Sequence, residues 1–195
     1  MARYVSSTFL FFLVLLSPLL PQASQPIMAQ STATAGVVDW NGWAFSYEVS
    51  GSYDGLSLLD VYYNNVSVLH KLSMPVMRVF YDFGICGPYA DRLGPEYLAP
   101  IAWADNALVV QREFTLDGRT WLELGIRAII GNYDIYQSYY LSTDGILDSH
   151  IFSRGLQCNA DHTHYPYWRF DFEVDGTNNQ IRRNGRRLAN LYHRI

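Results

Sequence analysis

Two histidines separated by one residue are the feature of this sequence that best suggests a chemical site. The motif Asp161-His162-Thr163-His164 is followed by an aromatic stretch at residues 165–172. On an extended strand side chains repeat with period two, so His162 and His164 point the same way. Neutral imidazole nitrogen binds copper, zinc, iron or nickel, and the pair alone does not choose among them. We therefore treat both histidines as candidate ligands of one metal ion.

The elements that must position this pair are strands rather than helices. Aromatic and β-branched residues alternate in short runs, which are separated by turn signals such as Asp117-Gly118. These runs lie at residues 43–49, 56–63, 66–72, 107–114, 121–130, 135–141 and 165–174. Helical periodicity is absent apart from one turn expected around residues 73–77, and residues 82–104 form a long irregular stretch typical of a functional loop. The sequence predicts an all-β fold, an antiparallel β-sandwich.

The first 35 residues have the composition of a secretory signal peptide. Arg3 is the only charged residue there, residues 9–16 form a short apolar core, and prolines and small residues come after it. The apolar run is shorter than the roughly 20 residues that cross a bilayer, so a membrane anchor is the weaker alternative. We expect cleavage between residues 24 and 35. The mature protein is then secreted, extracellular or periplasmic, with no membrane segment.

The remaining chain is expected to form one sandwich domain at residues 36–180, followed by a basic tail at residues 181–195. The formal net charge is −4, and the one arginine cluster lies in that tail, so nucleic-acid binding is not expected. Cys86 and Cys158 are the only cysteines. In an exported protein two cysteines suggest one disulfide, although their number does not show it.

Four ordered blocks cover most of residues 40–180. They are residues 43–63, residues 68–81 ending in Val79-Phe80-Tyr81, the motif Gly131-Asn132-Tyr133-Asp134, and residues 162–179 beginning with the histidine pair. In order and content these blocks resemble the catalytic β-sandwich domain of the copper amine oxidases. The third and fourth blocks are the most specific. The resemblance implies a cofactor, a metal and a set of catalytic residues.

By the resemblance, Tyr133 is the precursor of topaquinone, a quinone made in place by copper and oxygen. Such a quinone accepts electrons from a primary amine, which no unmodified side chain can do. Asn132 and Asp134 would flank this cofactor, and His162 and His164 would be two copper ligands. An ordinary tyrosine at the end of a strand is the alternative for Tyr133.

By the same resemblance, the long loop would supply the remaining catalytic groups. Asp91 matches the base that takes the α-proton of the substrate, Tyr89 the gate two residues before it, and Tyr81 the group that hydrogen-bonds the quinone. An exposed loop aspartate is the alternative for Asp91. Asp171 and Glu173 match positions that bind a peripheral calcium-type ion in some members, although a solvated strand face would also explain them.

The sequence departs from the family pattern at two places that matter for activity. The third copper ligand of the family is a histidine far downstream of the pair, and the remaining histidines, His70, His150 and His193, have no matching context. Ile129 also replaces the family's threonine four residues before the tyrosine.

Three functions are compatible with these residues. The leading one is oxidation of a small primary amine by oxygen to an aldehyde, ammonia and hydrogen peroxide, in a homodimer as the resemblance implies. The second is a non-catalytic secreted module derived from the same family. The third is a carbohydrate-binding sandwich, suggested by aromatic residues at strand spacing. Those aromatics are Trp103, Trp121, Tyr165, Tyr167 and Trp168.

Overall fold

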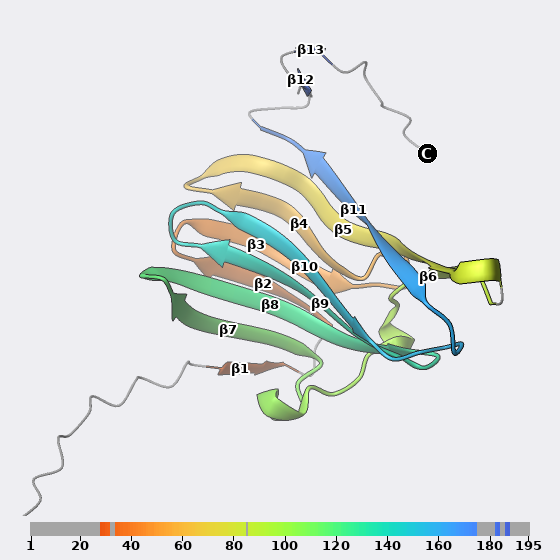
Figure 1. Cartoon of the computed structure of the whole chain (residues 1–195). Coiled ribbons are helices and arrows are strands. Elements are labelled where there is room, and N and C mark those ends of the chain that lie inside the picture. Colours follow the sequence, from red (N-terminus) through yellow and green to blue (C-terminus); the bar gives the residue numbers. More distant parts are fainter. Residues whose placement is uncertain (1–27, 32–33, 85, 175–181, 184–185, 188–195) are drawn as a thin grey trace, which may run out of the picture.

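The protein is a sandwich of two antiparallel sheets (Figure 1). A computed structural model describes residues 28–31, 34–84, 86–174, 182–183 and 186–187. Strands supply nearly all of the regular structure in these residues, which confirms the expected all-β class.

The first sheet has the strand order β1-β7-β8-β9-β10, and every neighbouring pair is antiparallel. Its strands are β1 (Met28–Ser31), β7 (Val109–Leu116), β8 (Arg119–Ile130), β9 (Tyr133–Ser142) and β10 (Leu147–Arg154). Short turns join β7, β8, β9 and β10 in succession, so this part of the sheet is a simple meander.

The second sheet has the order β11-β5-β4-β3-β2. Its strands are β2 (Ala35–Trp40), β3 (Trp43–Val49), β4 (Leu56–Tyr63), β5 (Val66–Tyr81) and β11 (His162–Phe172). A short strand, β6 (Tyr89–Asp91), pairs with the far end of β5. Between β5 and β7 lie three 3₁₀ turns, η1 (Asp82–Gly84), η2 (Pro95–Tyr97) and η3 (Ala102–Ala104). Near the C-terminus, β12 (Arg182–Arg183) pairs with β13 (Arg186–Arg187).

The core lies between the two sheets and results directly from the alternation of side chains along each strand. In β3 the buried positions are Trp43, Phe45, Tyr47 and Val49, with partly exposed residues between them. The inner faces of both sheets contribute to one continuous hydrophobic cluster. Burial of this apolar surface is the main force that holds the two sheets together.

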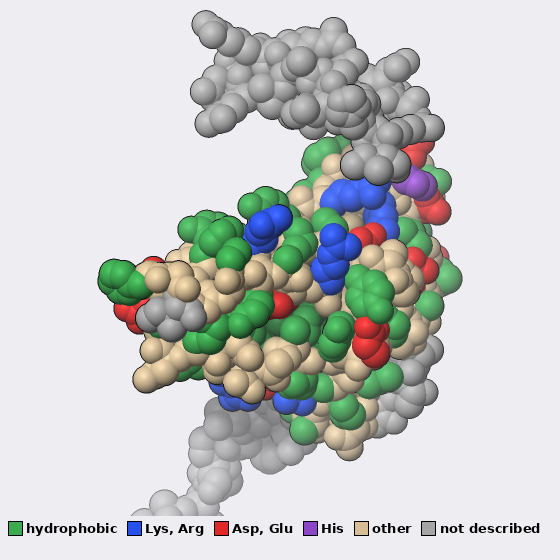
Figure 2. Space-filling model, turned by 90° about the vertical axis from the view of Figure 1, so that its right-hand side faces the viewer, with side chains coloured by type: hydrophobic (Ala, Val, Ile, Leu, Met, Phe, Trp, Pro, Cys, Tyr) green, Lys and Arg blue, Asp and Glu red, His purple; other side chains and the backbone are tan. Residues whose placement is uncertain are grey.

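Many apolar side chains nevertheless remain at the surface. Phe83 in η1 is 96% exposed, Phe152 in β10 is 62% exposed and Tyr167 in β11 is 52% exposed. Figure 2 shows hydrophobic side chains spread among polar ones over one whole face of the molecule. Two of these exposed residues lie on β10 and β11, the outermost strands of their sheets in the described part of the chain.

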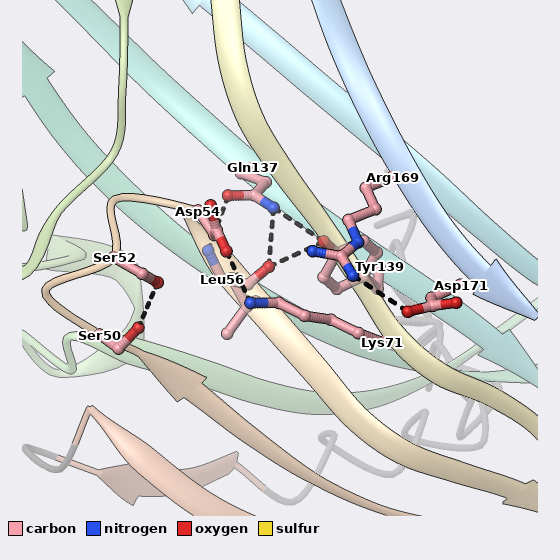
Figure 3. Close-up of polar contacts among 9 residues, drawn as sticks. All are labelled: Ser50, Ser52, Asp54, Leu56, Lys71, Gln137, Tyr139, Arg169 and Asp171. Carbon is pink, nitrogen blue, oxygen red and sulfur yellow. Dashed lines mark hydrogen bonds and ion pairs between the residues drawn. The ribbon is translucent and has the colours of Figure 1, made fainter. Parts of the chain in front are cut away.

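A buried polar clamp joins the two sheets (Figure 3). The Gln137 side chain accepts a hydrogen bond from Leu56 N (2.9 Å) and donates to Leu56 O (3.0 Å) and to Tyr139 Oη (2.9 Å). Tyr139 Oη donates to the same Leu56 carbonyl at 2.8 Å. The first residue of β4 therefore has both backbone groups satisfied by side chains of β9.

Several strand boundaries differ from those expected. The expected turn at residues 73–77 is wrong, because these residues continue strand β5. Pro75 lies where the pairing with β11 shifts register and after the pairing with β4 has ended, so its missing N–H interrupts no ladder. Strands β2 and β10 were not expected at all.

The expected signal peptide lies mostly outside the described residues, as does most of the basic tail. Strand β1, inside the expected signal region, pairs with β7. Cleavage in the first part of the expected interval, before Met28, would keep β1 in the mature chain, and cleavage itself stays a prediction. Among the described residues, no helix has the length and apolar character to cross a bilayer.

Candidate functional site

The two histidines lie on the inner face of β11. His162 is opposite Tyr81 on β5, and His164 is opposite Val79. Both imidazoles are half-buried, whereas Thr163 between them is exposed. The period of two along the strand therefore directs both rings toward the other sheet.

Tyr133 comes from the facing sheet. It begins β9 directly after a two-residue turn, Gly131-Asn132, and pairs with Ile130 at the end of β8. Gly131 has a φ of 56°, in the left-handed region that glycine adopts easily. The Tyr133 side chain is only 3% exposed. The tight hairpin thus places a tyrosine at the start of the strand and turns its ring into the core.

The three rings of this cluster lie close together. The Tyr133 ring centre is 5.8 Å from that of His162 and 4.9 Å from that of His164, with the second contact edge-on. The two imidazole centres are 4.9 Å apart. Tyr81 stacks on His162 at 4.8 Å with the planes 20° apart. One phenol, two imidazoles and a second tyrosine therefore form a single cluster.

The Tyr133 hydroxyl is hydrogen-bonded to the Tyr81 hydroxyl. The Tyr81 oxygen also accepts a bond from Gln157 N at 3.3 Å. Burial and the bond to Tyr81 raise the pKa of the Tyr133 phenol well above its ordinary value. At neutral pH Tyr133 is therefore a neutral phenol, with its oxygen held in place by its neighbour.

Each imidazole has one ring nitrogen near a second group. His162 Nδ1 is 3.3 Å from Ala160 O, so Nδ1 carries the proton and Nε2 is the basic nitrogen. His164 Nδ1 is 3.4 Å from Met77 Sδ. Desolvation, and the neighbouring His162, lower the pKa of His164, which favours the neutral form that binds metals.

The pair fits copper by donor type, since imidazole suits this metal. No third histidine, cysteine, aspartate or glutamate joins the pair within the described part of the chain. A further side-chain donor that contacts the pair is the sulfur of Met77, beside His164, and no sequence motif indicated it. A methionine on a core strand gives no signal in the sequence that separates a ligand from ordinary packing.

The segment between β10 and β11 fixes the turn before Tyr133. Gln157 Oε1 accepts a bond from Asn132 N at 3.2 Å, and Asn132 Nδ2 donates to Leu156 O at 3.3 Å. A disulfide between Cys158 and Cys86 ties the same segment to the loop after β5. Asn132 therefore fixes the conformation of the turn before Tyr133, through both its backbone N–H and its side-chain amide. Gln157 was not expected, because a contact between two loops leaves no trace in spacing.

Asp91 ends β6 and is half-buried, opposite Met77 on β5. Its Oδ2 is buried without a hydrogen-bond partner, and desolvation raises the pKa of the carboxyl group. Asp91 also borders a cavity of about 400 Å³. The residues lining that cavity are Tyr53, Ala90, Asp91, Arg92, Tyr97 and Ile130. This is a partly desolvated carboxylate at an open cavity rather than an exposed loop aspartate.

Tyr89, on the same short strand as Asp91, contacts the ring cluster. Its ring meets Tyr81 edge-on with centres 6.1 Å apart, and its hydroxyl is 3.0 Å from the Cys86 sulfur. The side chain is partly exposed. Tyr89 thus touches the cluster from the solvent side.

Asp134 and Ile129 face away from the cluster. Asp134 receives two bonds from Arg127 (2.8 and 3.1 Å) and one from Arg154 (2.7 Å). The hydrogen bonds from Arg127, supported by Arg154, lower the pKa of Asp134. Ile129 pairs with Asp134 and is 39% exposed. The family's missing threonine therefore corresponds here to a position on the outer face, away from the Tyr133 ring.

The candidate residues for a peripheral ion have other partners. Asp171 Oδ2 accepts a bond from Arg169 at 3.0 Å (Figure 3), and Glu173 lies 4.0 Å from His70. No group of three histidine, cysteine or acidic side chains includes them within the described residues. Calcium binding at Asp171 and Glu173 stays a prediction.

The aromatic residues that suggested carbohydrate binding do not share one surface. Tyr165 and Tyr167 are exposed on β11, whereas Trp168 packs on Tyr139 in the core at 5.8 Å. Trp103 lies in η3 against Arg112, beside the first sheet. Trp121 lies on β8 of that same sheet. No single aromatic platform results.

Comparisons with known proteins show a fold and no more. No family model matches the chain, and no curated protein matches its sequence. Among solved structures, an amine oxidase of Aspergillus nidulans has a TM-score of 0.61 at 20% identity over 82% of this chain. A copper-containing benzylamine oxidase of Hansenula polymorpha gives 0.56 at 17% identity over 87% of the chain. The lysyl oxidase of Pichia pastoris gives 0.57 at 17% identity over 74%.

The chain covers 31%, 38% and 28% of those three proteins in the same order, about a third of their length. Identities this low carry no information on activity. The chain therefore shares the β-sandwich fold found in part of these amine oxidases.

Proposed function

We propose that this chain is a copper-dependent oxidase of primary amines in which Tyr133 is converted to a quinone cofactor. The observation that supports this most strongly is the cluster of the Tyr133 phenol with the imidazoles of His162 and His164. The sandwich fold shared with part of amine oxidases is compatible with this proposal. The cluster contains what such a reaction needs, namely an oxidisable ring beside a pair of metal donors.

His162 and His164 would hold copper, which when bound activates dioxygen beside the phenol ring. Conversion of the phenol to the topaquinone-type cofactor would consume two molecules of dioxygen. The ring gains two oxygen atoms and loses two hydrogens, and one hydrogen peroxide is released. The chain's own part is to hold the ring within reach of both imidazoles.

Tyr81 orients Tyr133 in this proposal. Its hydroxyl holds the phenol oxygen, and Gln157 N in turn fixes the Tyr81 oxygen at 3.3 Å. This bond fixes the position of the phenol oxygen and so keeps the axis of the Tyr133 ring directed past the metal pair. Burial of Tyr133 also keeps bulk water from the reacting ring.

Asp91 is the proposed base for substrate oxidation. Its carboxylate is partly desolvated, its Oδ2 is buried without a hydrogen-bond partner, and desolvation raises its pKa, which makes it a better proton acceptor than a fully solvated aspartate. The adjoining cavity can hold the apolar part of a small amine against Tyr53, Tyr97 and Ile130. Tyr89 then controls access from solvent.

The overall reaction balances for a primary amine with an α-hydrogen. Oxidation of the amine to the imine level releases two electrons and two protons, one proton from the α-carbon and one from the nitrogen, and dioxygen finally takes them up as hydrogen peroxide. Water then releases ammonia and leaves the aldehyde. One amine, one dioxygen and one water thus give one aldehyde, one ammonia and one hydrogen peroxide.

The test is to load the purified protein with copper in air and analyse peptides by mass spectrometry. The peptide with Tyr133 should gain two oxygens and lose two hydrogens, and a visible quinone absorption should appear. Tyr133→Phe should show neither change, whereas Tyr165→Phe, at an exposed tyrosine of β11, should behave like the wild type. An unmodified Tyr133 in the folded, copper-treated protein would refute the proposal and leave the non-catalytic module.

Export and self-association are further parts of the proposal. The Cys86–Cys158 disulfide supports export, because disulfides persist in oxidising compartments. The exposed apolar residues on the outermost strands support a homodimer. Amino-terminal sequencing of the secreted protein and sedimentation equilibrium test the two points separately.

A further inference from the structure

The histidine pair needs a third donor to hold a metal ion firmly, because affinity and geometry depend on the number of ligands. Histidine, cysteine and acidic side chains supply none within the described residues. A soft donor that contacts one member of the pair is the thioether of Met77, with Sδ 3.4 Å from His164 Nδ1. Met77 is 1% exposed, so its sulfur contacts the imidazole inside the core.

The strand register explains why Met77 reaches this position. On β5, the alternate residues Met77, Val79 and Tyr81 are buried and share the inner face. They run beside His162 and His164 on β11, with Met77 opposite Pro166. The methionine is thus a diagonal cross-strand neighbour of His164, a distance that a long side chain can cover.

We propose that Met77 Sδ completes a three-donor site with His162 and His164, and that this site selects a soft monovalent ion, Cu(I). The inference rests on the copper pair of the proposed function but not on quinone formation or amine turnover. In this proposal a thioether is the third metal ligand, whereas the family resemblance implies a third histidine in that role.

The contact distance agrees with shared ligation. Metal bonds of about 2.0 Å to nitrogen and 2.3 Å to sulfur, at a tetrahedral angle, set the two donors about 3.5 Å apart. The observed separation of 3.4 Å matches this, so an ion can enter with little movement of either side chain. A plain hydrogen bond from Nδ1–H to sulfur would give a similar separation, and titration with a soft metal ion separates the two.

The donor set determines the kind of ion. Thioether sulfur is a soft ligand that favours Cu(I), whereas hard divalent ions favour oxygen. All three donors are uncharged when they bind, so this donor set does not offset the second charge of a divalent ion at a half-buried site. The site should therefore prefer Cu(I) and its redox-inert analogue Ag(I) over Zn(II).

The experiment compares two methionines on the same strand. Met74 and Met77 are both buried in β5, and leucine conserves the volume of either. Metal-free wild type and Met74→Leu should each bind one Ag(I) in calorimetric titration. Met77→Leu should bind it more weakly by roughly tenfold or more, as expected when a donor is lost. Zn(II) binding should change little between the two variants.

A second readout does not depend on the folding of Met77→Leu. In Met74→Leu protein labelled with selenomethionine, the selenium of Met77 is the one buried in β5, and selenium absorption spectra should show silver as its neighbour. Equal Ag(I) affinity of the two leucine variants with no silver near selenium would overturn the role of Met77 and leave the histidine pair intact. Absence of Ag(I) and Cu(I) binding in the wild type would overturn the copper pair as well.

Discussion

Replacing Gln137 with leucine should destabilise the sandwich more than its single position suggests. The Gln137 side chain is fully buried and bonds both backbone groups of Leu56. In Gln137→Leu the Leu56 N–H loses its acceptor inside the core, which costs about 1–3 kcal/mol, and the other lost bonds add about 1 kcal/mol. The total of about 2–4 kcal/mol should lower the urea midpoint by about 1–2 M for an m of about 2 kcal/mol/M, the middle of the usual range.

Tyr139→Phe is the matched control for that prediction. It removes the bond from Tyr139 Oη to Leu56 O and the bond that Tyr139 Oη accepts from Gln137 Nε2, but both bonds between Gln137 and the Leu56 backbone remain, so the expected cost is about 1–2 kcal/mol. Urea unfolding followed by tryptophan fluorescence gives both values with unchanged m. If Gln137→Leu costs no more than Tyr139→Phe, the clamp does not stabilise the fold as argued.

Three further predictions concern the surroundings of the site. The pKa of Asp134 is lowered from the ordinary 3.8, so its ion pairs stabilise the fold at higher pH. That stabilisation is lost as the pH falls through the lowered pKa. In Asp134→Asn, the free energy of unfolding measured as a function of pH should therefore fall less steeply on the acid side. Gly155→Ala should lower the free energy of unfolding by about 1–3 kcal/mol in thermal unfolding, because its φ is +128° and a Cβ there would collide with the backbone. The control Gly51→Ala, where a Cβ would meet open space, should lower it by less than about 1 kcal/mol. Replacing Cys86 and Cys158 by serine should cost up to about 4 kcal/mol, because the disulfide closes a long loop, and equal denaturation midpoints would contradict this.

The strands of the sandwich could be predicted where their sequences show a clear pattern of apolar residues. Strands β3 and β4 have the expected bounds, because apolar residues alternate cleanly in one and fill the other. Strand β10 was missed, since Asp148, His150 and Arg154 occupy its outward positions and serines two of its inward ones. The turn expected around residues 73–77 did not form, because β5 is paired on both sides of Pro75 and continues through it.

The candidate site also combines residues that could be predicted from the sequence with residues that could not. The proximity of Tyr133 to His162 and His164 was implied by the resemblance to the copper amine oxidases, whereas strand periodicity by itself placed only the two histidines on one face. Met77 and Gln157 could not be predicted, because their contacts depend on the register of β5 with β11 and on the path of a loop. A one-residue slip in that register would turn the methionine away from the imidazoles.

The histidines sit on β11, the outermost strand of its sheet in the described part of the chain, which is hydrogen-bonded to β5 alone. Such a strand can detach locally without unfolding the rest. The disulfide at Cys158 anchors its leading end just before His162. A metal ion would then reach the histidines when β11 briefly separates from β5. Hydrogen exchange of the β11 amides should therefore slow markedly when metal binds, while exchange in β3 and β4 stays unchanged.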